Sequence, residues 1–180
     1  MQILISYHSD YGNTERMAEA IAAGIKARTP EATVVRKKAV DTTNQDLQSA
    51  DVIVFGTPVH MGAMAWQMKK LIDDAYKFWM GNELEGKVGG VFVSGGGFGG
   101  AGGGVELTMA SLYSNFLEHG MVVVGFPKSL LGYADGGLQW GPYGRSGRHD
   151  GMPDQVSDAA LSACRSYGAH LAEIAAKLLG

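Results

Sequence analysis

The stretch Ser9-Asp10-Tyr11-Gly12-Asn13-Thr14 separates a short apolar run from a helical pattern near the start of the chain. The run before it, residues 2–7, predicts a buried strand. The residues after it, 15–25, predict a helix, because Met17 and Ile21 begin an apolar stripe that recurs every four residues. A strand that leads into a helix through small and hydroxylated residues directs unpaired backbone N–H groups at one point. We therefore expect this stretch to bind a phosphate group.

The stretch contains no lysine, which distinguishes it from the G-x-x-x-x-G-K-[ST] loop that binds nucleoside triphosphates. Ser9, Asn13 and Thr14 offer side-chain donors instead. Such a loop suits a single terminal phosphate monoester better than a triphosphate. A plain helix start, capped by Ser9 or Asn13 and without a ligand, is the alternative that this stretch alone leaves open.

Length and composition favour one globular domain over residues 1–180. The 15 basic and 18 acidic residues leave a net charge of −3, which gives no support for binding to nucleic acid or to a membrane surface. No apolar run approaches the ~20 residues of a membrane span, and no secretory signal is visible. The single cysteine, Cys164, fits the apolar side of a helix. These features predict a cytoplasmic protein.

Strands and helices alternate along the chain. Strands are predicted at residues 2–7, 33–37, 51–56, 88–94 and 121–124, and helices at 15–25, from 65 onward, at 106–119 and at 156–179. Residues 41–49 are expected to be a short polar connection and residues 125–153 a long loop. The alternation predicts an α/β fold, a flavodoxin-like three-layer sandwich with a five-stranded parallel sheet in the order 2-1-3-4-5.

Three unusual loops leave strands one, three and four, which flank the point where the strand order reverses and where such sheets bind ligands. The loop after strand three carries Pro58, Val59, His60, Met61 and Gly62. The loop after strand four begins with Ser94, Gly95, Gly96, Gly97 and Phe98. Glycines without a Cβ let main chain approach a flat ligand closely. A phosphate, a short linker and a planar ring would fit the three loops together, which describes flavin mononucleotide (FMN).

Other kinds of site fit the sequence less well. Residues 95–100 match G-x-G-x-x-G, but they follow the fourth strand and lack the acidic partner of a dinucleotide-binding loop. No histidine spacing typical of a metal site and no G-x-S-x-G hydrolase motif is present. Six aromatic residues are expected near the loops and could form a wall over a planar ligand: Tyr11, Trp66, Trp79, Phe98, Trp140 and Tyr143.

The chain resembles the WrbA-type NAD(P)H:quinone oxidoreductases, which are flavodoxin-like proteins that bind FMN. The resemblance covers nearly the whole chain. It rests on residues 9–14, on Phe55-Gly56-Thr57-Pro58 with Gly62 and Met64, on Trp79 before Gly86-Lys87, on Ser94 with its glycine loop, and on residues 119–122 and 141–144.

The resemblance implies that Ser9 to Thr14 hold the FMN phosphate, that the ring lies beside Val59, His60 and Met61, and that Ser94 to Gly97 form the next binding loop. It also implies that His119 lies near FMN. Tyr11 would contact the nicotinamide cofactor, NADH or NADPH, and Trp79 would contact a small-molecule quinone. The implied reaction is a ping-pong, two-electron transfer in a homo-oligomer, either a dimer or a tetramer, and it needs no protein general base.

The chain also departs from this family. Glu118 stands where the family carries the first of two adjacent histidines, and His60-Met61 stands where the family carries an Arg-Phe pair. The segment between strands two and three lacks an insert that the family uses near its subunit contacts. A flavodoxin-like electron carrier, or an FMN-binding module without quinone reductase activity, therefore stays open as an alternative.

Overall fold

The computed structural model describes residues 1–97, 102–148, 150 and 154–180. Its strands are β1 (Gln2–Tyr7), β2 (Thr33–Lys38), β3 (Val52–His60), β4 (Ala63–Met64), β5 (Val88–Gly95), β6 (Val122–Val123), β7 (Gly137–Leu138) and β8 (Gly141–Arg145). Its helices are α1 (Asn13–Arg28), α2 (Asn44–Ser49), α3 (Trp66–Asp74), α4 (Tyr76–Gly81), α5 (Val105–Glu118), α6 (Tyr133–Gly136) and α7 (Asp158–Leu179), with a 3-10 turn, η1, at Ala39–Asp41.

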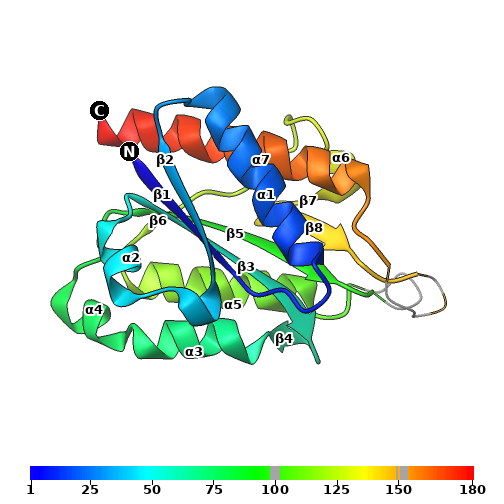
Figure 1. Cartoon of the computed structure of the whole chain (residues 1–180), viewed down its shortest axis with the longest axis horizontal. Coiled ribbons are helices and arrows are strands. Elements are labelled where there is room, and N and C mark those ends of the chain that lie inside the picture. Colours follow the sequence, from blue (N-terminus) through cyan, green and yellow to red (C-terminus); the bar gives the residue numbers. More distant parts are fainter. Residues whose placement is uncertain (98–101, 149, 151–153) are drawn as a thin grey trace.

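The elements form three layers around a mostly parallel sheet (Figure 1). The sheet runs in the order β2-β1-β3-β5-β8-β7, and β6 pairs with β5 as well. Helices α1 and α7 cover one face, and α3 and α5 cover the other (Figure 1). The predicted order 2-1-3-4-5 is confirmed, with β2 at one edge and β5 in the place of the fourth predicted strand.

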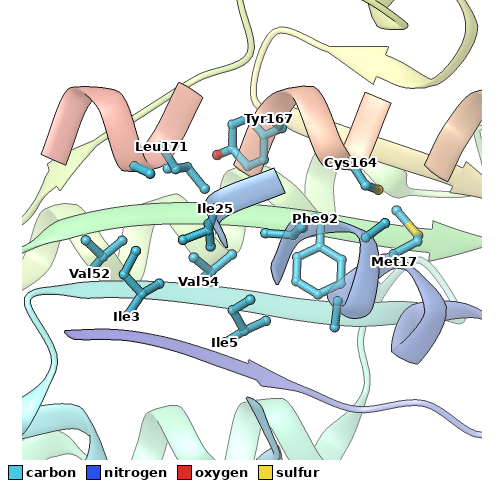
Figure 2. Close-up of a cluster of buried hydrophobic side chains, with 14 of the residues drawn as sticks. Ile3, Ile5, Met17, Ile25, Val52, Val54, Phe92, Cys164, Tyr167 and Leu171 are labelled. Carbon is cyan, nitrogen blue, oxygen red and sulfur yellow. The ribbon is translucent and has the colours of Figure 1, made fainter. Parts of the chain in front are cut away.

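The two faces of the sheet bury separate apolar clusters, because successive side chains of a strand point in opposite directions. In β1, Ile3 and Ile5 pack beneath α1 and α7, whereas Leu4 packs toward the helices of the other face. Figure 2 shows part of the first cluster, in which the aromatic rings of Phe92 and Tyr167 are fully buried. Cys164 belongs to this cluster, and burial raises the pKa of its thiol well above the ordinary value. It is therefore a core residue, as expected.

The position of the fifth strand is divided between two short strands. Strand β6 pairs with the start of β5, at Val88 and Gly89, and β8 pairs with its end, at residues 93–95. The prediction of a long loop at residues 125–153 was wrong, because α6, β7 and β8 lie within this segment. The loop forms structure because its chain returns to the open edge of β5 and pairs with backbone groups there.

Two buried tyrosines bridge the gap between β6 and β8. The Tyr167 hydroxyl donates to the backbone oxygen of Val124 at 2.6 Å and accepts from the backbone N–H of Val91 at 3.3 Å. The Tyr113 hydroxyl contacts the same Val124 oxygen and that of Trp140. Burial raises the pKa of Tyr113 to about 12 and raises that of Tyr167 well above its ordinary value, so both stay protonated donors. Side chains thus satisfy backbone groups that an unbroken strand would pair.

Two smaller expectations also needed correction. Residues 41–49 contain α2 rather than a plain connection, because Thr43 and Asp46 form a capping box at its start. The loop expected after strand three is largely a β-hairpin, in which β3 continues to His60 and pairs with β4. Within the described residues, no helix combines the length and the apolar character needed to cross a membrane.

Candidate functional site

A crevice opens at the carboxyl ends of β1, β3 and β5, where the sequence predicts a ligand. Most of the predicted cofactor residues line it, together with two that the sequence did not indicate. The lining residues are Ser9, Asp10, Tyr11, Asn13, Thr14, Pro58, Val59, His60, Ser94, Gly95, Gly96, Ser146 and Gly147. The crevice therefore joins the three loops that follow these strands, as the strand order requires.

The loop between β1 and α1 presents a phosphate-sized anion site. Gly12 adopts a left-handed conformation, with φ of 81°, and precedes α1 without any side-chain cap on the helix. The first backbone N–H groups of α1 therefore remain available to an anion, at the positive end of the helix dipole. The Ser9 hydroxyl is buried and has no hydrogen-bond partner among the described residues. A buried donor without a partner costs free energy, so Ser9 is better explained by a bound acceptor than by packing.

Asn13 and Thr14 line the crevice, but their side chains hold the site together. Asn13 Nδ2 donates to the backbone oxygen of Asp154 at 2.8 Å, and its Oδ1 accepts from the backbone N–H of Val156 at 2.9 Å. The Thr14 hydroxyl lies 2.8 Å from that of Ser94, at the end of β5. These bonds tie the first turn of α1 to β5 and to the segment before α7. Of the three side chains expected to donate to the phosphate, Ser9 is thus the one whose hydroxyl is not already engaged by another described residue.

The β3–β4 hairpin forms the second wall. Its two turn residues, Met61 and Gly62, both have positive φ, 48° and 86°, as tight two-residue hairpins require. Pro58, Val59 and His60 face the crevice, whereas the Met61 side chain is fully exposed to solvent. The turn is held in place because the Gly62 backbone contacts Gly104, where a Cβ would lie 2.5 Å from Gly62 Cα.

The end of β5 and the segment after β8 form the third wall. Ser146 and Gly147, which line this wall, were not predicted, because they follow a strand without the usual β-forming residues. Gly147 packs directly on Gly96, and the Arg145 guanidinium donates to the Gly97 carbonyl at 2.8 Å. Several glycines therefore serve loop-to-loop packing. A Cβ at Gly96 would nevertheless meet no atom within 4 Å, so this side of the residue is open, as an approaching ring would need.

Asp10 lies between two histidines at the crevice. His8 Nε2 is 3.0 Å from Asp10 Oδ1, and His60 Nε2 is 2.9 Å from Asp10 Oδ2. The two imidazole rings stand edge to face, with centroids 6.3 Å apart. Asp10 and His60 line the crevice, and the His60 side chain is 42% exposed whereas that of His8 is 13% exposed.

Two predicted residues lie far from this crevice in the same chain. Trp79 is in α4, at the opposite end of the sheet from β4 and the crevice (Figure 1). His119 caps the end of α5 and shortly precedes β6, which pairs with the first residues of β5. Its neighbour Glu118 ends α5 at the same place. Phe98 lies outside the described residues.

The expected aromatic wall is not a single surface. Tyr11 lines the crevice and is 81% exposed, and Trp66 is exposed at the start of α3. Trp140 and Tyr143 instead pack partly buried against the core, and the Tyr143 hydroxyl donates to the Gly95 carbonyl at 3.3 Å. Tyr11 is thus the aromatic side chain placed to meet a planar ligand in the crevice.

The described residues fit FMN. The uncapped α1 terminus and the orphaned Ser9 hydroxyl suit its phosphate, and the open backbone near Gly96 and the apolar Pro58 and Val59 suit a flat ring. A parallel α/β sheet with an anion site of this kind at its reversal point defines a protein of the flavodoxin-like class.

The chain belongs to the NADPH-dependent FMN reductase family, whose model matches residues 16–135. It is 36% identical to a protein of Syntrophobacter fumaroxidans named NAD(P)H dehydrogenase (quinone), over 99% of this chain and 98% of that protein. Among solved structures it is similar to the flavodoxin, WrbA-like protein from Agrobacterium tumefaciens, with 31% identity, a TM-score of 0.71 and 98% of each chain covered. A flavodoxin from the domain Archaea is 25% identical, with a TM-score of 0.69, over 98% of this chain and 99% of that one. The predicted family resemblance is confirmed.

Proposed function

We propose that this protein catalyses the FMN-dependent, two-electron reduction of quinones by NADH or NADPH. The observation that carries the proposal is the phosphate site, where an orphaned Ser9 hydroxyl lies beside a helix terminus without a side-chain cap. The relative's and family's names supply the donor and acceptor, and they confirm the sequence-based expectation of an FMN-dependent oxidoreductase.

The chain's own residues would bind and orient the reactants. Ser9 and the first N–H groups of α1 hold the phosphate, and the β3–β4 hairpin with Gly95 and Gly96 confines the ring. When bound, FMN supplies the redox chemistry that couples the nicotinamide to the quinone. Tyr11, exposed at the crevice, offers a face on which the nicotinamide or the quinone can stack.

The decisive experiment is anaerobic mixing of the FMN-loaded protein with NADH or NADPH, followed by a simple benzoquinone. We expect the flavin absorbance to bleach with a nicotinamide and to return with the quinone. Tyr11→Ala should lower kcat/KM roughly 5-fold, since a stacked aromatic contact contributes about 1 kcal/mol. Leu131→Ala removes a similarly exposed apolar side chain that does not line the crevice, and it should change nothing. A flavin that stays oxidised with both nicotinamides would exclude the proposed function.

A flavodoxin-like electron carrier is the second candidate, favoured by the similarity to the archaeal flavodoxin. The net charge of this chain, only −3, argues against the carrier role, because electron carriers use acidic surfaces to dock their partners. Reductive titration separates the two candidates. A carrier should take up its electrons in two resolved steps, whereas a two-electron reductase should show one step.

We also infer that the chain acts as one domain in a cytoplasmic homo-oligomer, either a dimer or a tetramer. Trp79 lies remote from the crevice of its own chain, so the predicted contact between Trp79 and the quinone requires a second copy. The exposed side chains of Tyr76, Trp79 and Met80 on α4 support such a contact surface. Sedimentation equilibrium tests the oligomer, and a mass of 19.0 kDa, that of one chain, would exclude it.

A further inference from the structure

Quinone reduction needs one proton more than the nicotinamide provides. A hydroquinone contains two electrons and two protons beyond the quinone, but the hydride equivalent from NADH or NADPH carries two electrons and one proton. The balanced reaction is NAD(P)H + H⁺ + quinone → NAD(P)⁺ + hydroquinone. The second proton must come from water or from an acid at the crevice, and a positioned acid accelerates such transfers by about 10²- to 10⁴-fold.

The crevice contains one side chain suited to that task. Its titratable lining residues are Asp10, Tyr11 and His60. Of these, only histidine ordinarily changes charge between about pH 5 and pH 8, so it can both give and regain a proton during turnover. His60 Nε2 lies 2.9 Å from Asp10 Oδ2, and this contact fixes the orientation of the imidazole ring. This leaves Nδ1 as the nitrogen that can donate to a bound quinone.

Resting on the function proposed above, the geometry points to His60 as the proton donor to the quinone, with Asp10 as its positioning residue. The Nδ1–H bond of the His60 imidazolium breaks as an O–H bond forms on the quinone oxygen. The neutral imidazole then takes a proton from solvent, which its 42% exposure permits. The arrangement of a carboxylate behind an imidazole orients the ring and stabilises its cation.

The neighbouring elements define the field at His60. From the end of β1, His8 binds the other oxygen of Asp10 at 3.0 Å and so fixes the carboxylate. From α3, two lysines face the same groove as His60, and each is paired with an aspartate four residues later: Lys69 with Asp73 and Lys70 with Asp74. Those charges largely cancel. Arg145, after β5 in the sheet, directs its guanidinium to the carbonyls of Gly97 and Gly147. Asp10 is thus the unbalanced charge that acts on His60.

Within the described residues, no set of three or more histidine, cysteine, aspartate or glutamate side chains is arranged to hold a metal ion. The cluster of His8, Asp10 and His60 is therefore not arranged as a metal centre, although it combines two histidines with a carboxylate. Its spacing suits a network that holds and moves a proton.

The experiment separates proton-dependent from proton-independent oxidation of the enzyme. Enzyme reduced by NADH is mixed anaerobically with benzoquinone, or with ferricyanide, which accepts electrons without a proton. In wild type, we expect the quinone rate to depend on pH and the ferricyanide rate to depend on it much less, because only the quinone takes up a proton. His60→Gln should slow the quinone step by at least roughly 10-fold at neutral pH and flatten its pH profile. Its reduction by NADH and its oxidation by ferricyanide should stay at the wild-type rates.

Two further variants test the positioning role. Asp10→Asn should slow the quinone step and leave the ferricyanide step at the wild-type rate, since His60 loses the carboxylate that orients its ring. In the protein without FMN, the same variant should change the NMR signals of the His60 imidazole, because the ring loses its contact with the carboxylate. His170→Gln is the matched control, because His170 lies on α7 beside a separate groove and should leave the profile unchanged.

The outcomes are distinguishable. A wild-type protein that neither oxidises NADH nor reduces benzoquinone defeats the proposed function itself. A wild-type protein that turns over while His60→Gln keeps the same quinone rate and pH profile overturns the role of His60, and water is then the donor. Equal losses with quinone and ferricyanide would also overturn it, because they would indicate a structural defect.

Discussion

The Ser9 hydroxyl is the single side chain whose environment makes most sense with a ligand present. It is buried and has no hydrogen-bond partner among the residues that the structure describes, so the free protein bears the cost of dehydrating it. We expect Ser9→Ala to weaken FMN binding by roughly 10- to 100-fold, because a hydrogen bond to a charged group contributes about 1.5–3 kcal/mol. Fluorescence quenching of FMN on titration with protein measures this loss.

Riboflavin provides the control for Ser9, because it lacks the phosphate. Its affinity should be the same in Ser9→Ala and wild type. The variant without FMN should also unfold in urea at an equal or higher concentration, since it no longer buries an orphaned hydroxyl. A parallel loss of riboflavin and FMN affinity would show that Ser9 shapes the crevice rather than binds the phosphate.

At the level of individual residues, the sequence located the site better than it assigned the roles. Ser9, Asn13 and Thr14 were indistinguishable as candidate donors, because the pattern alone cannot show which polar side chain is already paired. Asn13 is engaged by Asp154 and Val156, far away in sequence. The pairing of Asp10 with His60 was equally hidden, since it depends on how β1 and β3 end side by side.

The divided fifth strand is the element whose stability depends most on side-chain hydroxyls. Tyr167→Phe would leave the Val91 N–H without its partner and would remove one donor from the Val124 oxygen. We expect the free energy of unfolding to fall by about 1–3 kcal/mol, the cost of an unsatisfied buried polar group. Urea denaturation followed by circular dichroism measures the change.

Tyr133→Phe is the matched control for that change. The Tyr133 ring packs edge to face on Phe126 in the same region, but its hydroxyl makes no hydrogen bond within the described part of the chain. We expect a change within about 0.5 kcal/mol, as for substitutions that remove no interaction. Similar losses in the two variants would show that ring packing, rather than the Tyr167 hydroxyl, holds the two half-strands.

The crossing of α1 and α7 is a second stabilising feature, and it relies on glycine. A Cβ at Gly168 would lie 2.2 Å from the Ile21 carbonyl oxygen, and one at Gly24 would lie 1.9 Å from the Arg165 oxygen. Gly168→Ala should therefore separate the helices and cost about 1–3 kcal/mol of stability. The control is Gly81→Ala in α4, where a Cβ meets only the flexible Glu83 side chain and should be neutral or stabilising. If the two variants have the same melting temperature, the close crossing of α1 and α7 is contradicted.

Regular elements were predictable from sequence where apolar residues recur at a clear period. The strands β1 and β5 and the helices α1 and α7 follow such patterns because each buries one face or both. Strand β8, with the sequence Gly-Pro-Tyr-Gly-Arg, has no such pattern. It forms because the end of β5 offers unpaired backbone groups, and that is a property of the tertiary structure rather than of the segment.

Across the whole molecule, the alternation of strands and helices fixed the topology, and the topology fixed the end of the sheet that binds a ligand. The sequence could not show that Trp79 and His119 lie at the other end of the sheet. A resemblance to a family matches positions along the chain, but it does not say how far apart those residues lie within one copy of the protein. The crevice could therefore be predicted from the loops that follow the strands. Trp79 and His119 were predicted as site residues only from the resemblance to the family.

The stability of the whole fold should depend on pH through the buried His119 and the half-buried His170. Burial lowers the pKa of His119 below its ordinary value of 6.5, although the nearby Glu118 raises it in part, and burial lowers the pKa of His170 in the same way. The unfolded chain therefore binds protons that the folded chain does not. This contribution is fully present above about pH 6.5 and is lost as the pH falls below it. Ordinary carboxylates titrate near pH 4, so the loss of stability caused by the histidines occurs at a higher pH than any loss caused by carboxylates.

His119→Asn tests this dependence, because it removes the buried imidazole, whose Nδ1 has no partner among the described residues, and keeps a small polar group. We expect wild type to lose stability in urea between about pH 7.5 and pH 5.5, and the variant to lose less, since one proton-binding site of the unfolded chain is absent. Adding His170→Asn should flatten the dependence further. If His119→Asn follows the wild-type curve over this range, the histidine is protonated in the folded protein and its burial does not oppose the charge.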